Sequence, residues 1–150
     1  MDYSPDFLSA VAESGICSAY YSLCRDHPLR LDEPLAKAPG AEILRVANGT
    51  LQLKSLAGPG TVLQLVGLPE HISLNFIVQG RSSVETDFSV RFGDVIERGT
   101  FAVLCNVATT STGGPVSNPP YPRPNFHSLE ELIKIMCRLD TLVRKLGAIT

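Results

Sequence analysis

The sequence predicts an α+β fold, with an N-terminal helix, an antiparallel sheet of about five or six strands, a proline-rich crossover and a C-terminal amphipathic helix. Three observations predict this class. Apolar stripes with helical spacing lie near both ends of the chain. Residues 71–92 alternate between apolar and polar side chains, and residues 109–126 show neither period. The length of 150 residues indicates one domain, 1–150, with a proline- and glycine-rich internal connector at 109–126.

The N-terminal helix begins after Ser4, because Ser4, Pro5 and Asp6 suit an N-cap and a first turn. Gly15 lowers the stability of this helix by about 1 kcal/mol relative to Ala, and it marks close packing or a break. Residues 25–41 contain three prolines and no period, so we expect a surface connector there. The apolar face of the helix consists of Leu8, Ala12, Ile16, Ala19 and Leu23.

Alternating segments predict the strands of the sheet. Residues 42–55 centre on Asn48 and Gly49, a pair that tolerates positive φ in a tight turn, and we expect a β-hairpin there. Residues 61–66, 71–79 and 84–92 follow as strands, and residues 80–83 can close a hairpin between the last two. Residues 61–66 are short and apolar, whereas the period of two in residues 71–79 and 84–92 implies that one face of the sheet is buried and the other lies in water.

The second half of the chain shows less alternation of apolar and polar residues than residues 71–92. Residues 100–109 are apolar on both faces apart from Asn106, so we expect a central strand that is covered on both sides. The connector at 109–126 holds five prolines and two glycines and suits neither a helix nor a central strand. Ser128 and Glu131 then fit a capping box, and Gly147 ends the C-terminal helix.

The composition excludes several classes of protein. With 44% hydrophobic and 19% charged residues, the chain is too apolar to be disordered throughout. Its net charge of −2 lacks the basic excess that makes nucleic acid a general partner. We expect no membrane partner, because no apolar run approaches the ~20 residues that cross a bilayer. The acidic N-terminal residues do not resemble a secretory signal, so we expect a cytoplasmic protein with four reduced cysteines.

Residues for catalysis or metal binding are weakly indicated. The GxSxG, Walker A and GxGxxG patterns are absent and the cysteines form no CxxC pair, so we expect no cofactor and no metal. We expect His27, His71 and His127 in separate surface or capping positions. The acid–base candidates are Glu85 and Asp87 on one face of a strand, together with His71. The alternative for the two carboxylates is a solvated outer face.

Two segments are candidates for binding another protein. Pro119, Pro120, Tyr121 and Pro122 predict an extended left-handed segment of the kind that SH3 and WW domains bind; the alternative is a stiff connector. The apolar stripe of the C-terminal helix predicts an interface between subunits, and its alternative is packing on the chain's own sheet. The interface residues are Leu132, Met136, Leu139, Val143 and Leu146.

These observations favour a non-enzymatic, homo-oligomerising interaction subunit, such as a scaffold, an adaptor or a chaperone-like protein of an intracellular assembly. The physical reason is apolar area. A sheet face of several hundred Å² left exposed by one chain is worth on the order of 10 kcal/mol when a second chain covers it. Another protein is the other partner we consider. The alternative function is a small-molecule-binding domain or an enzyme, with a pocket between a curved sheet and the helices.

Overall fold

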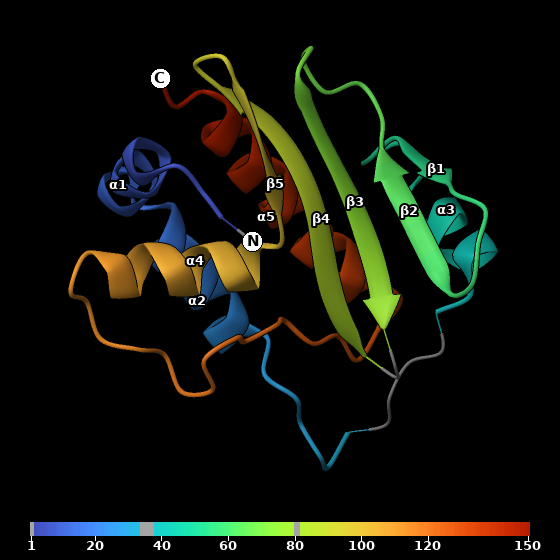
Figure 1. The fold of residues 1–150 in the computed structure, drawn as a ribbon. Coiled ribbons are helices and arrows are strands. Elements are labelled where there is room, and N and C mark those ends of the chain that lie inside the picture. Colours follow the sequence, from blue (N-terminus) through green and yellow to red (C-terminus); the bar gives the residue numbers. More distant parts are fainter. Residues whose placement is uncertain (1, 34–37, 80–81) are drawn as a thin grey trace.

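The computed structural model describes residues 2–33, 38–79 and 82–150, and the α+β class is confirmed within them (Figure 1). The helices are α1 (Pro5–Ser14), α2 (Ile16–Asp26), α3 (Gly40–Ala47), α4 (Phe101–Ser111) and α5 (Leu129–Gly147). The strands are β1 (Leu53–Ser55), β2 (Thr61–Leu65), β3 (Ile72–Gln79), β4 (Ser83–Phe92) and β5 (Val95–Gly99).

The strands form one antiparallel meander in the order β1-β2-β3-β4-β5, so each strand pairs with its neighbour in sequence. The longest ladder joins β3 to β4, from Ile72 opposite Val90 to Gln79 opposite Ser83. The strands predicted at 61–66, 71–79 and 84–92 are confirmed to within one residue at each end. Strand β5 is an element that the sequence pattern did not indicate. Of the turn expected at 80–83, residues 80 and 81 lie outside the described residues.

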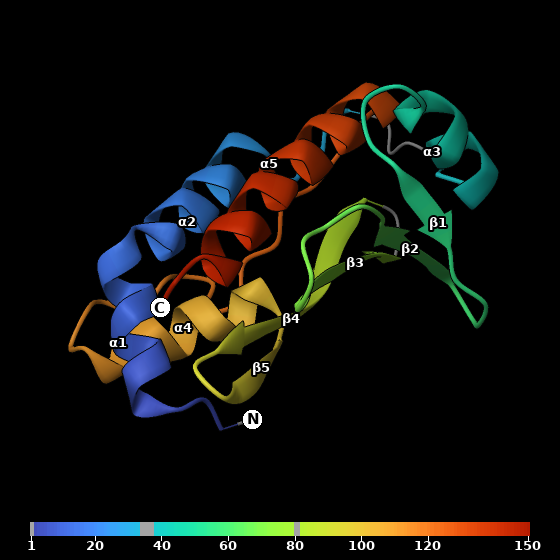
Figure 2. The same cartoon turned by 90° about the horizontal axis from the view of Figure 1, so that it is seen from above.

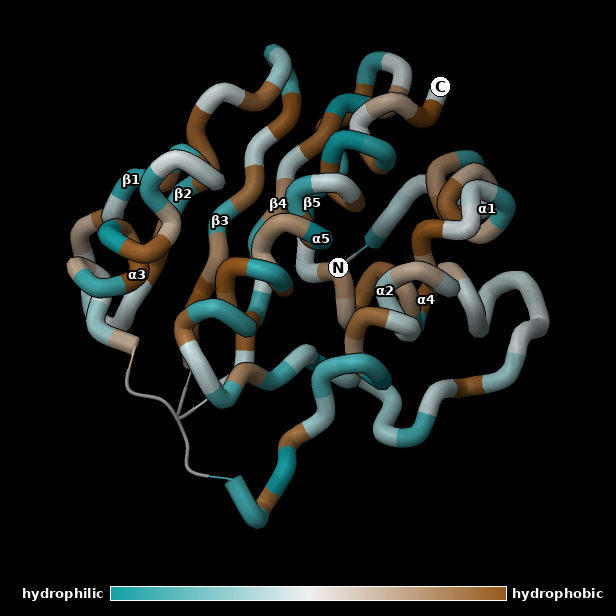
Figure 3. Tube along the Cα trace, turned by 180° about the vertical axis from the view of Figure 1, so that it is seen from behind, coloured by the Kyte–Doolittle hydropathy of each residue, from teal (hydrophilic) through white to brown (hydrophobic). Residues whose placement is uncertain are grey.

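The sheet buries one face, as its alternating pattern predicted. Leu74, Phe76 and Phe88 point into the core and are at most 1% exposed. The polar row of the other face includes Asn75, which is half-buried, and its cross-strand neighbour Asp87, which is exposed. Helix α5 covers β3 and β4 on the buried side, and α3 covers β1 and β2 (Figure 2). Figure 3 shows the matching alternation of apolar and polar residues along α5.

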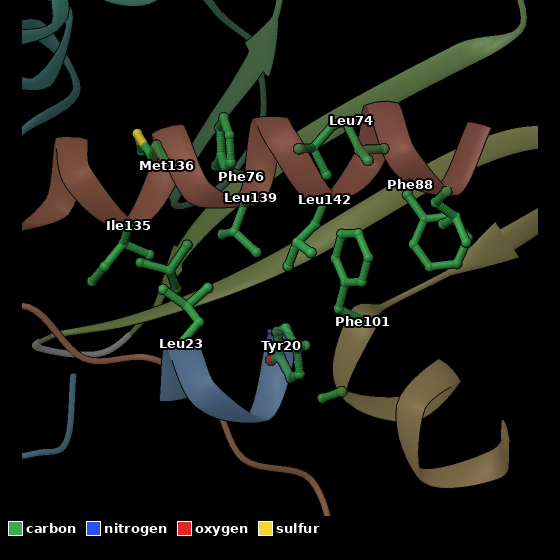
Figure 4. Packing of buried hydrophobic residues seen from close by; sticks show 14 of the residues in the cluster. Tyr20, Leu23, Leu74, Phe76, Phe88, Phe101, Ile135, Met136, Leu139 and Leu142 are labelled. Carbon is green, nitrogen blue, oxygen red and sulfur yellow. The ribbon is translucent and has the colours of Figure 1, made fainter. Parts of the chain in front are cut away.

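The core lies where α5 meets the sheet and the helices α2 and α4. Figure 4 shows side chains of α5 between the strands and the aromatic rings of α2 and α4. Tyr20 stacks on Phe101 with a centroid separation of 5.7 Å, and Phe101 packs against Phe88 at 5.4 Å. The interior between sheet and helices is therefore filled by side chains that are almost completely buried.

The hairpin predicted at residues 42–55 is wrong in its first half. Residues 40–47 form α3, and β1, at residues 53–55, pairs with β2 instead. Gly49 has the positive φ of 85° that the turn prediction required. However, it lies just beyond a helix, where the N–H groups of Thr50 and Leu51 both donate to the carbonyl of Ala47 at 2.9 Å. A residue that tolerates positive φ suits the end of a helix as well as a hairpin turn.

The central strand predicted at residues 100–109 is also wrong, because this segment forms α4. Thr100 is its N-cap: the Oγ1 atom accepts a hydrogen bond from the N–H of Val103 at 3.1 Å. A helix that is apolar on most of its circumference must be surrounded by protein. Helix α4 meets that condition, because it packs against α1, α2 and β4. Residues 100–109 are therefore covered on both sides, as their apolar sequence predicted, by other elements of the same chain.

The N-terminal helix is divided at Gly15, whose φ of 82° ends α1 and begins α2. Gly15 therefore marks a break, one of the two outcomes expected for it. The connector predicted at 25–41 starts after α2 and leads to α3, and its residues 34–37 lie outside the described residues. The C-terminal helix is confirmed as α5, with Ser128 as its N-cap.

Candidate functional site

The proline-rich connector is held against the domain at its C-terminal end. The chain at residues 124–126 runs beside the start of β4, where the N–H of Val84 donates to the carbonyl of Pro124 at 3.2 Å. In return, the N–H of Phe126 donates to the carbonyl of Ser82 at 2.8 Å. Pro124 and Phe126 are buried. This end of the connector therefore acts as a short added edge of the sheet.

The residues before this edge form a ridge, which we define as Pro119–Pro122. Two helices hold it through its carbonyl groups, because Tyr20 Oη donates to the carbonyl of Pro122 at 2.8 Å and Asn106 Nδ2 to that of Pro120 at 3.3 Å. Backbone groups thus fasten the ridge, while the side chain of Tyr121 remains 50% exposed. The segment that the sequence singled out for docking lies here on the surface, with Tyr121 exposed, and its role in docking stays a prediction.

A cavity lies on each side of the ridge, and we call the pair the proline-rich groove. One, of about 370 Å³, lies between α2 and residues 115–119. The other, of about 340 Å³, lies between the ridge, Pro28 and the start of β4. Cys24, Pro119 and Pro122 line both cavities, so Cys24 forms a common floor. Proline rings line both cavities, Val116 and Tyr21 add apolar wall to the first, and serine and asparagine side chains add polar wall to each.

The charges at the groove are arginines. Arg25 lines the first cavity and is exposed. Arg123 lines the second and forms an ion pair with Glu85, whose side chain is 8% exposed. Burial raises the pKa of the Cys24 thiol to about 12, so this cysteine is an uncharged apolar group on the floor. The groove therefore combines apolar walls with polar serine and asparagine side chains, and Arg25 is its exposed cation.

Exposed apolar side chains lie on the wall and the ridge of the groove and on the connector at residues 27–33. Val116 is 60% exposed on one wall, and Tyr121 projects from the ridge. The connector at residues 27–33 adjoins the groove and adds Leu29 at 47% and Leu31 at 91% exposure. Figure 1 shows this connector and the proline-rich connector along the same end of the molecule.

An ionic cluster fixes the 27–33 connector to the start of α5. Glu131 accepts a hydrogen bond from His27 Nδ1 at 2.8 Å and another from the N–H of His127 at 2.7 Å. Arg30 Nη2 lies 3.3 Å from the same carboxylate, and the N–H of Arg30 donates to His127 Nε2 at 3.1 Å. The expectation of separate positions for His27 and His127 is therefore wrong, because both contact Glu131.

The structure does not bring the three acid–base candidates together. Glu85 is buried in its ion pair with Arg123, whereas Asp87 is exposed and lies 3.4 Å from Asn75 Nδ2. His71 lies at the opposite end of the sheet, beside Arg91, whose Nη1 donates to its Nε2 at 3.2 Å. Arg91 is six residues along β4 from Glu85, or about 20 Å at 3.3 Å per residue.

The five stripe residues of α5 lie inside the protomer. Each is at most 1% exposed, and α5 packs on β3, β4, α2 and α3. Of the two alternatives drawn from the sequence, packing on the chain's own sheet is the one the structure contains. The residues are Leu132, Met136, Leu139, Val143 and Leu146.

Two further hollows lie elsewhere on the surface. One, of about 640 Å³, is lined by Leu44 and residues 48–53, none of which is ionisable. Another, of about 410 Å³, contains His71 and Arg91. Across residues 2–33, 38–79 and 82–150, no cluster of three or more His, Cys, Asp or Glu side chains suits a metal ion. Across the same ranges, the helices are too short or too polar to cross a bilayer.

Comparison with known proteins gives no match: no family model, no curated protein and no solved structure is significantly similar to this chain. The function must therefore be argued from the groove and its chemistry. Sequence reasoning found the ridge through its prolines but not its partners on α2, Cys24 and Arg25. Both lie more than 90 residues before the ridge, and neither belongs to a motif. A short apolar floor beneath a proline-rich segment leaves no local signal in a sequence.

Proposed function

We propose that this protein is a non-enzymatic interaction module that binds an extended segment of another protein along the proline-rich groove. The observation that carries the proposal is the pair of cavities flanking an ordered ridge, with Tyr121 and Val116 exposed beside them. Two adjacent apolar hollows suit two side chains of one extended chain. Scaffold or adaptor roles are the broader classes that fit such a module.

The chemistry of the groove selects the partner segment. Proline, tyrosine and valine walls favour aromatic or large aliphatic side chains, and Arg25 at the rim favours an acidic neighbour. We therefore propose a partner segment in which apolar and acidic residues alternate. Self-association through the α5 stripe is not part of this proposal, because those side chains are already enclosed. The free thiols fit a reducing compartment, and cytoplasmic localisation belongs to the same proposal.

The test uses a fluorescein-labelled peptide that alternates Glu with Phe and Leu, titrated with the full chain and followed by fluorescence anisotropy. We expect saturable binding that Tyr121→Ala or Val116→Ser weakens roughly tenfold, or about 1.4 kcal/mol. Val95→Ser is the matched control, since Val95 is comparably exposed at 49% but lies at the β4–β5 turn. It should leave the affinity unchanged.

A charge-reversal variant tests the proposed contact between Arg25 and the acidic residues of the peptide. Arg25→Glu should weaken binding of the Glu peptide and strengthen binding of the same peptide with Lys in place of Glu. Backbone amide shifts in an NMR titration should cluster at residues 20–25 and 115–123. Failure of the peptide to bind, or binding that Val95→Ser and Val116→Ser reduce equally, would refute the groove as the binding site.

A further inference from the structure

His127 is a buried histidine whose two ring nitrogens have different surroundings. Its side chain is 3% exposed, and its Nδ1 atom lies 3.4 Å from the Glu131 carboxylate. Its Nε2 atom accepts a hydrogen bond of 3.1 Å from the backbone N–H of Arg30. A backbone N–H can only donate, so Nε2 carries no proton while this bond exists. The ring is therefore neutral, with its proton on Nδ1, whenever the bond from Arg30 is formed.

Side-chain contacts around this bond also tie the 27–33 connector to the start of α5. Glu131 accepts a hydrogen bond from His27 Nδ1 at 2.8 Å and lies 3.3 Å from Arg30 Nη2. Despite the burial of Glu131, the hydrogen bonds from His27 and from the N–H of His127 hold its pKa below its usual range. Glu131 therefore stays charged while a histidine titrates, and a protonated His27 still donates to it. The contact that a proton removes is the one at Nε2.

Protonation of Nε2 turns a hydrogen-bond acceptor into a donor. Two N–H groups then face each other where the bond from Arg30 was, and they repel. The new charge also lies close to the Arg30 guanidinium, which pairs with Glu33 at 2.7 Å. Glu131 attracts the new charge, but it already serves His27 and Arg30. A charged ring in this buried position is therefore accommodated when the connector backbone at Arg30 moves away.

We propose that His127 is a proton-controlled latch that regulates the proline-rich groove, an inference that rests on the function proposed for that groove. The latch is the hydrogen bond from the Arg30 N–H to Nε2. It is closed above the usual titration range of histidine, near about pH 6.5, and it opens below that range. Pro28, two residues before Arg30, lines the second cavity of the groove. Opening the latch displaces this wall, so acidification weakens binding of the partner segment.

The latch is tested first on the full chain without peptide, by NMR between about pH 7.5 and 5.5, which brackets the histidine range. The His127 ring should titrate together with the backbone amide shift of Arg30. The hydrogen-exchange protection factor of that amide should fall roughly two- to tenfold, the value of one hydrogen bond. A ring that stays neutral throughout, or an Arg30 amide that does not follow the ring, would overturn the latch without recourse to a variant.

Substitutions at position 127 separate the acceptor from the proton. His127→Gln places an amide oxygen near the position of Nε2, and this oxygen accepts at every pH. The variant should keep the protection of the Arg30 amide and lose its pH dependence, whereas His127→Ala should lack the protection at both pH values. His71→Gln, at the opposite end of the sheet, is the matched control and should respond as the wild type does. A pH response that survives in His127→Gln would assign the effect to His27 instead.

The regulation of the groove is tested with the labelled peptide of Glu, Phe and Leu at the same two pH values. Its glutamates stay ionised across this range, because their usual pKa is about 4.3. The affinity of the wild type should fall roughly two- to tenfold on acidification, and that of His127→Gln should not. Equal affinity at both pH values, with the Arg30 amide released, overturns the regulation alone. A peptide that binds at neither pH refutes the proposed function, and the regulation with it.

Discussion

At the residue scale, Glu131 joins three segments of the chain. Its carboxylate accepts hydrogen bonds from His27 and from the backbone of His127, and it faces the Arg30 guanidinium. Burial acts to raise the pKa of Glu131, but the hydrogen bond from His27, that from the N–H of His127 and the charge of Arg30 outweigh it. The pKa is therefore lowered on folding, and the ionised form stabilises the folded state.

Glu131→Gln should lower the free energy of unfolding by about 2 kcal/mol at neutral pH, because it weakens charge-assisted hydrogen bonds. A lowered pKa in the folded state stabilises the protein above the unfolded value of about 4.3. This stabilisation is lost as the pH falls through the lower folded value. Urea unfolding followed from neutral pH to below the unfolded value should therefore show a shallower loss of stability in the variant than in the wild type.

Glu130→Gln is the control for that measurement, because Glu130 is exposed on the same turn of α5. It should change stability by only a few tenths of a kcal/mol. An equal effect of the two substitutions would show that the loss comes from charge at the helix N-terminus rather than from the His27 and Arg30 contacts.

At the scale of elements, the sequence predicted β2, β3, β4 and the C-terminal helix, and it predicted the N-terminal helix apart from its break at Gly15, but it gave no indication of β5. It failed at α3 and α4 for separate reasons. Gly49 supplies a positive φ, which is found both in hairpin turns and at helix ends. The run at residues 100–109 is apolar throughout, and periodicity alone does not separate a buried helix from a buried strand. The side-chain cap of Thr100 on Val103 is the local signal that distinguishes them.

The contribution of the Thr100 N-cap to the free energy of unfolding can be measured. Thr100→Ala removes the Oγ1 acceptor for the Val103 N–H, so thermal and urea unfolding should show a loss of about 1 kcal/mol. Thr110→Ala, at an exposed position near the other end of α4, should cost less. A larger loss of stability in Thr110→Ala than in Thr100→Ala would mean that the N-terminal cap is not the main local contribution to the stability of α4.

The packing of α5 gives a second measurement at this scale. Leu139 is fully buried among the core side chains, and Leu139→Ala should lower the free energy of unfolding by ~2–5 kcal/mol. The molar mass in solution should not change. Lys134→Ala, at an exposed position on the same helix, is the control. A Leu139→Ala protein of normal stability but altered mass would instead identify the stripe as an interface between subunits.

At the scale of the whole molecule, the exposed surface is that of an ordinary single chain. The accessible area is 8002 Å², against about 7,500 Å² expected for a monomer of this mass. We therefore expect size-exclusion chromatography with light scattering to report the mass of one chain, 16.2 kDa. A dimer that persists at roughly micromolar protein concentration would contradict this expectation. It would point to a surface other than the α5 stripe.

The candidate site could be predicted from the sequence only in part. The prolines at 119, 120, 122 and 124 predict an extended segment, because the proline ring fixes the backbone angle φ. The groove also requires Tyr20 and Cys24 beneath that segment, and the Glu131 cluster requires His27, which is 104 residues away. These contacts depend on how α2, α4 and α5 pack. Helix packing brings distant segments together without leaving a spacing pattern in the sequence.

The meander has a consequence for how the chain acquires its structure during synthesis. Every strand pairs with the next one along the chain, so the ribosome can release residues 53–99 as a sheet that closes through short loops. The lid of that sheet, α5, is translated later. Until residues 129–147 emerge, Leu74, Phe76 and Phe88 stay uncovered on a nascent chain, and this interval is when aggregation or chaperone capture would compete with folding.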